Sequence, residues 1–168
     1  MSLSKIGMPG TRTGIVIADD LIINSIRNMN AVINLATANF GSMIANDLLR
    51  SGEMQRLSQS EIKPFYQKKL KHALRIIRRE FDGIDYYIHR PEGAIFLWLW
   101  LPDLSISTDK LYERLKSRGV LVISGSHFFP GLEGNWEHKH QCLRITYSMD
   151  EDTVEKGIKL IADEIRAI

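Results

Sequence analysis

The sequence has a single cysteine, no long apolar run and almost no net charge. Cys142 alone cannot form an internal disulfide bond, and the opening residues MSLSK lack the apolar segment of a signal peptide, so we expect a reducing, cytoplasmic setting. The longest apolar run, residues 94–101, is far shorter than the roughly 20 residues that a membrane helix needs, so no membrane partner is expected. A formal net charge of +2 argues against a nucleic-acid partner.

The first third of the chain combines a glycine-rich loop with helical spacing. Residues 5–14 (KIGMPGTRTG) have the composition of a loop and run into the β-prone residues 15–17, which predicts a loop followed by a strand. Over residues 20–52 the apolar side chains recur every three to four positions. This spacing predicts helices, interrupted near residues 36–39.

A long helix is predicted next. Ser58 and Glu61 have the spacing of a capping box, which predicts that the helix starts there, and Pro64 either kinks it or shifts its start. One stripe of the helix is apolar and the rest is largely basic. The basic side chains form either an anion-binding face or a solvated surface, and the near-neutral chain favours the solvated surface. The stripe comprises Ile62, Tyr66, Leu70, Ala73, Ile77 and Phe81.

After Gly83 the pattern changes to short β-prone runs, which places a domain boundary near the end of the long helix. Residues 94–101 are apolar on both faces, as in an interior strand. Trp98 and Trp100 can be read as a ligand platform, but two aromatic side chains on one face of such a strand more often belong to a core. We therefore expect both tryptophans in the core.

The remaining elements predict a compact α+β domain. A helix starts at Ser107 or Thr108 and ends at Gly119, and residues 120–123 and 143–147 read as strands. A last helix starts at Asp150 and faces the sheet. Its apolar stripe is Val154, Ile158, Ile161 and Ile165.

The densest group of chemically active residues lies at the amino terminus. Lys5 stands next to the hydroxyl groups of Ser2 and Ser4, and a glycine-bent loop brings Arg12 seven residues later. Such a loop can place an amine beside an anion site, as a phosphorylated aldehyde cofactor requires, with the guanidinium gripping the phosphate. On these residues alone, a flexible basic terminus before a strand is an equally good reading.

The wider pattern resembles fold-type-I aminotransferases that depend on pyridoxal phosphate (PLP). The opening residues match their lysine motif, S-x-S-K-x-G-x-P-G-x-R-x-G. Residues 91–99 (PEGAIFLWL), 119–128 (GVLVISGSHF) and 143–147 (LRITY) resemble successive parts of the small domain, in the same order. Within the family, the sequences of these segments are most similar to those of the valine-pyruvate aminotransferases.

The resemblance implies a role for each matched residue. Lys5 is the catalytic lysine that forms the imine with PLP, and its freed amine then acts as general base and acid. Ser2 and Arg12 contact the PLP phosphate, and Arg144 binds the substrate carboxylate. The implied activity is amino-group transfer between valine or alanine and a 2-oxo acid such as pyruvate, a reaction of amino-acid metabolism. It would follow a two-stage ping-pong mechanism.

The resemblance also implies an α/β fold made of the carboxyl-terminal portion of a PLP-dependent transferase. Residues 1–55 correspond to the tail of the large domain, residues 56–83 to the interdomain helix and residues 84–168 to the small α+β domain. In the family, the aspartate that pairs with the pyridine nitrogen precedes the lysine, whereas four residues precede Lys5 here. We therefore expect a truncated chain that binds PLP weakly alone and self-associates, as a homodimer or otherwise, through uncovered apolar surface.

A second reading is a non-catalytic remnant that persists as a folded oligomerisation or binding module. Arg144 also has an alternative, a structural salt bridge in the core. His127, His138 and His140 match no standard metal-ligand spacing, so we expect loop histidines and no metal site. The nucleophile elbow G-x-S-x-G of a Ser-His-Asp hydrolase is absent.

Overall fold

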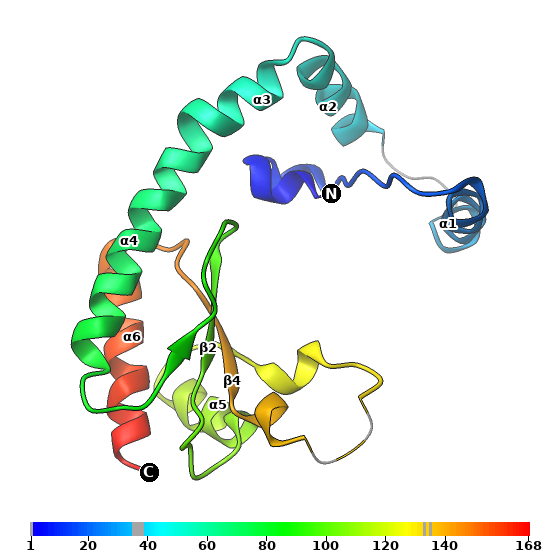
Figure 1. Cartoon of the computed structure of the whole chain (residues 1–168). Helices are drawn as coiled ribbons and strands as arrows, with labels where there is room; N and C mark the ends of the chain where they lie inside the picture. The colour runs from blue at the N-terminus through cyan, green and yellow to red at the C-terminus, as the bar shows by residue number, and fades with distance from the viewer. Residues whose placement is uncertain (1, 35–38, 133, 135) are drawn as a thin grey trace. The chain divides into compact units, whose positions relative to one another are not determined.

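The computed structural model describes residues 2–34, 39–132, 134 and 136–168. The chain divides into two compact units, residues 1–65 and residues 66–168, and each is described by itself. Figure 1 traces the elements from the amino terminus to the carboxyl terminus. In the described residues, no helix has the length and apolar composition to cross a bilayer.

The first unit is helical. It contains the 3-10 turns η1 (Leu3–Ile6) and η2 (Pro9–Thr11), the helices α1 (Asp20–Ile33), α2 (Phe40–Arg50) and α3 (Glu53–Leu57), and the π turn η3 (Ser58–Ile62). Its core is small, with the buried side chains Leu3, Ala45 and Met54. Of the interruption predicted near residues 36–39, residues 36–38 lie outside the described residues.

The strand predicted at residues 15–17 is wrong. Residues 15–17 have no regular structure, and the one ladder contact nearby is an isolated antiparallel bridge between Ser2 and Gly14. A β-prone sequence becomes a strand only when a neighbouring strand accepts and donates its backbone hydrogen bonds. Residues 15–17 belong to no strand, and Ile17 is 94% exposed.

The predicted helix start at Ser58 is also wrong. Ser58 has helical backbone angles (φ −59°, ψ −40°), and α3, η3 and α4 (Lys63–Glu80) follow one another without a break. The N–H of Lys63 donates to the carbonyl oxygen of Ser58, five residues earlier, as in a π turn. Pro64 has no N–H to donate, so the wider turn accommodates it inside a helix that begins well before it.

The second unit is built on an antiparallel sheet in the order β1-β2-β4-β3. The strands are β1 (Tyr87–Ile88), β2 (Phe96–Trp100), β3 (Ile123–Ser124) and β4 (Cys142–Thr146). Leu97 lies opposite Ile145, and Trp98 lies opposite Arg144. The interior position predicted for residues 94–101 is confirmed, because β2 pairs on both sides.

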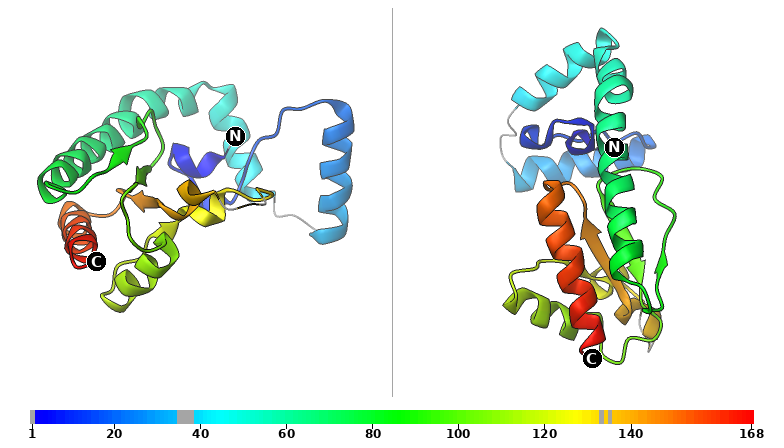
Figure 2. Two further views of the ribbon diagram at one scale, coloured as in Figure 1. Left: turned by 60° about the horizontal axis from the view of Figure 1, so that its bottom comes forward. Right: turned by 90° about the vertical axis from the view of Figure 1, so that its left-hand side faces the viewer.

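Three helices cover one face of this sheet: α4, α5 (Thr108–Ser117) and α6 (Glu151–Arg166) (Figure 2). Ser107 caps α5 and Asp150 caps α6, each accepting a hydrogen bond from the backbone N–H three residues later. The stripes predicted for α4 and α6 contribute to one buried cluster with the inward side chains of β2 and β4. Its fully buried members include Ala73, Ile77, Phe81, Leu97, Leu99, Leu111, Leu115, Leu143, Ile158 and Ile161.

Trp98 and Trp100 lie on the other face of the sheet, so their predicted place in this core is wrong. Side chains alternate along a strand, and Leu97 and Leu99 take the face that the helices cover. The tryptophans are half-buried. Trp98 packs edge-on against Phe128 and Phe129, and Trp100 contacts Tyr87 and His138.

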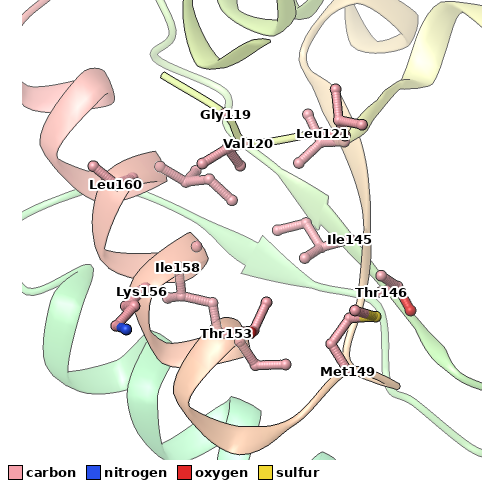
Figure 3. Close-up of a pocket in the computed structure, with 14 residues that line it drawn as sticks. Gly119, Val120, Leu121, Ile145, Thr146, Met149, Thr153, Lys156, Ile158 and Leu160 are labelled. Atoms are coloured by element: carbon pink, nitrogen blue, oxygen red, sulfur yellow. The ribbon is translucent and has the colours of Figure 1, made fainter. Parts of the chain in front are cut away.

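A hollow of about 260 Å³ opens on the helix-covered side, between α6 and residues 119–122 (Figure 3). Ile145 and Ile158 line it, and its polar lining comes from Thr146, Thr153 and Lys156. Arg144, the neighbour of Ile145 in β4, belongs to the opposite face of the sheet. The hollow therefore contains none of the predicted site residues.

Candidate functional site

The predicted cofactor residues lie in one closed loop, residues 2–14, which we call the lysine loop. The N–H of Leu3 donates to the carbonyl oxygen of Thr13 (3.1 Å), next to the bridge between Ser2 and Gly14. Leu3 is fully buried in the core of the first unit and anchors the loop. Gly7 adopts the left-handed conformation (φ 88°) that ends the first turn, which glycine does at low cost.

The polar side chains of the lysine loop are turned outward. Ser2, Lys5 and Arg12 are all exposed, and the Ser2 hydroxyl accepts a hydrogen bond from the N–H of Ser4 (3.3 Å). Arg12 has a left-handed backbone (φ 47°), which costs a residue with a side chain about 1–2 kcal/mol. The loop thus presents an amine, a guanidinium and a hydroxyl group to solvent.

Helix α2 supports the lysine loop through a position without a side chain. A Cβ atom built on Gly41 would lie 2.1 Å from the Thr13 hydroxyl oxygen and 2.7 Å from the carbonyl oxygen of Thr11. The same two threonines are tied together, since the Thr13 hydroxyl donates to the carbonyl oxygen of Thr11 (2.8 Å). The conformation that holds Arg12 therefore depends on this close helix-loop contact.

The fourth predicted residue, Arg144, lies in β4 of the second unit beside two aromatic rings. Its guanidinium carbon is 4.3 Å from the ring centre of Phe96 and 4.6 Å from that of Phe128. Its Nε atom is buried and has no hydrogen-bond partner among the described residues. The alternative prediction, a structural salt bridge, is not formed with any residue that the structure describes.

A chain of polar side chains fixes the segment that carries Phe128, the turn η4 (Gly125–Phe128). The buried hydroxyl groups of Thr108 and Ser124 are 2.9 Å apart, Ser124 and Ser126 are 3.1 Å apart, and Ser126 donates to Asp109 (2.9 Å). His140 Nδ1 lies 3.5 Å from the other Asp109 oxygen. Burial alone would raise the pKa of Asp109, but the hydrogen bonds from Ser126, Ser124 and His140 outweigh it and lower that pKa.

A second histidine in this region, His138, belongs to an aromatic cluster. Its ring lies 4.9 Å from the rings of Trp100 and Trp136, and its Nε2 atom lies 3.5 Å from the Cys142 sulfur. Across the residues that the structure describes, no three His, Cys, Asp or Glu side chains gather as metal ligands would.

Sequence reasoning missed both aromatic neighbours of Arg144. The alternation of side chains along a strand could have predicted the contact of Phe96, because it shares a face of β2 with Trp98, the register partner of Arg144. No sequence pattern predicts the contact of Phe128, since it reaches Arg144 from a turn whose course depends on tertiary contacts.

Comparison with known proteins identifies the family. The profile of aminotransferase class I and II matches residues 1–161. Valine-pyruvate aminotransferase of Escherichia coli K12 is 48% identical over 165 residues, which cover 98% of this chain and 40% of that protein.

Two crystal structures show the same likeness. Valine-pyruvate aminotransferase of Salmonella typhimurium LT2 is 48% identical with a TM-score of 0.89. The match covers 99% of this chain and 43% of the Salmonella chain. A putative amino-acid aminotransferase of Psychrobacter arcticum is 47% identical with a TM-score of 0.90. The match covers 99% of this chain and 38% of the Psychrobacter chain. The chain thus spans about 40% of the length of these relatives. It belongs to the class I and II aminotransferase family.

Proposed function

We propose that this chain supplies the lysine, the phosphate contacts and the substrate arginine of a PLP-dependent transaminase. The amino group would pass between valine or alanine and a 2-oxo acid such as pyruvate. The names of its relatives from Escherichia coli and Salmonella contain valine and pyruvate. The observation that carries the proposal is the lysine loop, which turns Ser2, Lys5 and Arg12 outward from one closed backbone.

The residues of the lysine loop fit two ends of PLP. A primary amine suits its aldehyde, and a guanidinium with a hydroxyl group suits its phosphate. Residues 2–18 contain no carboxylate for the pyridine nitrogen, so that partner lies outside the loop. When bound, PLP supplies the electron sink that makes the α-hydrogen of an amino acid acidic.

Each residue of the chain then has a defined task. Lys5 would hold the aldehyde carbon of PLP at rest, and its freed amine would move a proton between the substrate α-carbon and the cofactor. Ser2 and Arg12 hold the phosphate. Arg144 would bind the α-carboxylate with two parallel hydrogen bonds and so orient the bond of the α-carbon that is to be broken.

The same proposal assigns the parts of the chain. Residues 1–55 are the tail of the large domain, residues 56–83 the interdomain helix and residues 84–168 the small domain. Two features support this division: the long helix that ends at Glu80, and the separate core of the second unit.

A second candidate function is a non-catalytic module that binds a partner or a second copy. It is favoured by the apolar side chains that α1 and the segment before it leave exposed, among them Ile17 at 94%, Leu21 at 80% and Val32 at 79%. Replacing Leu21 and Val32 by Ser should then lower the apparent mass in sedimentation velocity, whereas Asn24→Ser on the same helix should not.

Isotope transfer separates the two candidates. Purified chain, PLP, ¹⁵N-labelled valine and pyruvate are incubated together, and ¹⁵N-alanine is followed by NMR. The transaminase proposal predicts transfer faster than with PLP alone and its loss in Lys5→Ala, with Lys63→Ala as the lysine control. Transfer at the rate of free PLP by a folded wild-type chain would favour the non-catalytic module.

A further inference from the structure

We propose that Phe96 and Phe128 are positioning residues that hold the Arg144 guanidinium in the orientation in which it receives a carboxylate. This inference rests on the proposed function, because it assigns a task to the neighbours of the substrate arginine. We call the pair of rings the aromatic clamp.

The clamp is built from two separate elements. Phe96 stands in β2, two residues from the register partner of Arg144, and Phe128 stands in η4. The ring centres lie 4.3 Å and 4.6 Å from the guanidinium carbon, within the range at which a cation is attracted to the face of an aromatic ring. Two such contacts from different directions restrict rotation of the guanidinium more than either one alone.

The Nε atom of the clamped guanidinium is closed to solvent. Nε is buried and without a hydrogen-bond partner in the described part of the chain, and it is the only guanidinium nitrogen in that state. The terminal amino groups are therefore the ones that can receive a carboxylate. The surrounding rings displace water from the cation, and an ion pair formed there is screened less than one in bulk solvent.

Phe128 is itself held on several sides. Its ring meets that of Trp98 edge-on, with centres 5.2 Å apart and planes at 90°. The turn that carries it is packed through Gly125 against Cys142 and is tied by Ser126 to Asp109. The clamp is thus formed by the folded unit itself, before any ligand arrives.

The neighbouring phenylalanine provides a matched control. Phe129 has ring contacts with Trp98, Trp136 and His138, and it follows Phe128 directly in the chain. Phe129→Leu removes an aromatic ring from the same loop but does not remove a ring of the clamp. Phe128→Leu and Phe96→Leu each remove one ring of it.

The test uses NMR of the arginine side chains in the full chain labelled with ¹⁵N. The Nε–Hε signal of Arg144 is assigned from its loss in Arg144→Lys, and sodium pyruvate is titrated against sodium chloride of equal ionic strength. Wild type and Phe129→Leu should show slow guanidinium rotation and a saturable shift with pyruvate. Phe128→Leu and Phe96→Leu should rotate faster and bind pyruvate about tenfold more weakly, as loss of one desolvated cation–π contact predicts.

The outcomes separate the two proposals. If pyruvate shifts the wild-type signal while rotation and affinity are the same in Phe128→Leu, Phe96→Leu and Phe129→Leu, the clamp is refuted and the carboxylate role of Arg144 stands. If pyruvate leaves the wild-type signal unchanged, the carboxylate role fails, and the rotation rates still decide the clamp. Circular dichroism of each variant identifies any that does not fold, and the second clamp variant then supplies the comparison.

Discussion

A Cβ atom built on Gly125 would lie 2.6 Å from the Cβ atom of Cys142, closer than real side chains approach. The same atom would lie 2.8 Å from the carbonyl oxygen of Cys142 and 2.9 Å from that of Lys139. Strand β4 and turn η4 can therefore pack together only where one of them lacks a side chain. This contact sets the position of Phe128 relative to Arg144, two residues along β4 from Cys142.

Gly125→Ala should destabilise the second unit and displace Phe128. The new methyl group meets backbone atoms of β4, which cannot rotate away, so we expect a loss of about 1–3 kcal/mol in the free energy of unfolding. Urea denaturation followed by tryptophan fluorescence measures the loss.

Gly157→Ala is the matched control for that change. Gly157 lies in α6 with no atom within 4 Å of an added Cβ, so alanine should raise the free energy of unfolding by about 0.5–1 kcal/mol through its helix preference. Equal effects of the two substitutions would mean that the Gly125 contact is not tight.

Cys142 should resist alkylation in the folded chain. Its side chain is fully buried, and burial raises the pKa of the thiol from 9.0 to about 11. Since the thiolate is the reactive form, iodoacetamide at pH 8 should react about 100-fold more slowly than with the chain unfolded in guanidinium chloride. The chain has one cysteine, so mass spectrometry reads the rate directly. Equal rates in the two conditions would show that β4 opens readily.

The hydrogen bonds to Asp109 should make part of the stability depend on pH. The folded-state pKa of Asp109 lies below its ordinary value of 3.8, because hydrogen bonds from Ser126, Ser124 and His140 outweigh the effect of burial. The stabilisation is therefore complete above about pH 5 and disappears as the pH falls through 3.8 and below.

Asp109→Ala should cost about 0.5–1 kcal/mol at pH 7, a modest value because the carboxylate is half exposed, and progressively less as the pH falls below 3.8. Asp109→Asn keeps an oxygen that accepts from Ser126 but does not titrate, so its stability should vary less with pH than that of wild type. Urea midpoints at a series of pH values give the comparison. A cost of Asp109→Ala that does not fall as the pH is lowered from 7 through 3.8 would contradict this account.

The sequence was most informative where local pattern and tertiary environment agree. In the predicted stripe, Ala73 and Ile77 of α4 and Phe81 directly after it are fully buried, and the run of residues 94–101, apolar on both faces, contains the paired interior strand β2. Both patterns show which side chains are removed from water on folding, and the burial of apolar side chains determines how these two elements pack. The lysine motif likewise identified the family, because its residues are close together in the chain.

Other features depended on contacts that a local pattern does not contain. Ser58 and Glu61 have the spacing of a helix start, yet the helix already runs through them from Glu53. Residues 15–17 are β-prone but do not form a strand. Trp98 and Phe128 meet on the sheet face that carries Arg144, and this contact depends on how turn η4 packs over that face.

The central claim is that Lys5 is the lysine of a PLP site. The most direct measurement is to incubate the chain with PLP, reduce it with borohydride and locate the phosphopyridoxyl group by peptide mass spectrometry. The account predicts that Lys5 is labelled far ahead of the other lysines, and that labelling of Lys5 falls in Arg12→Ala because the phosphate loses its guanidinium partner. Labelling of Lys5 no greater than that of the exposed lysines of α4, and unchanged in Arg12→Ala, would contradict it.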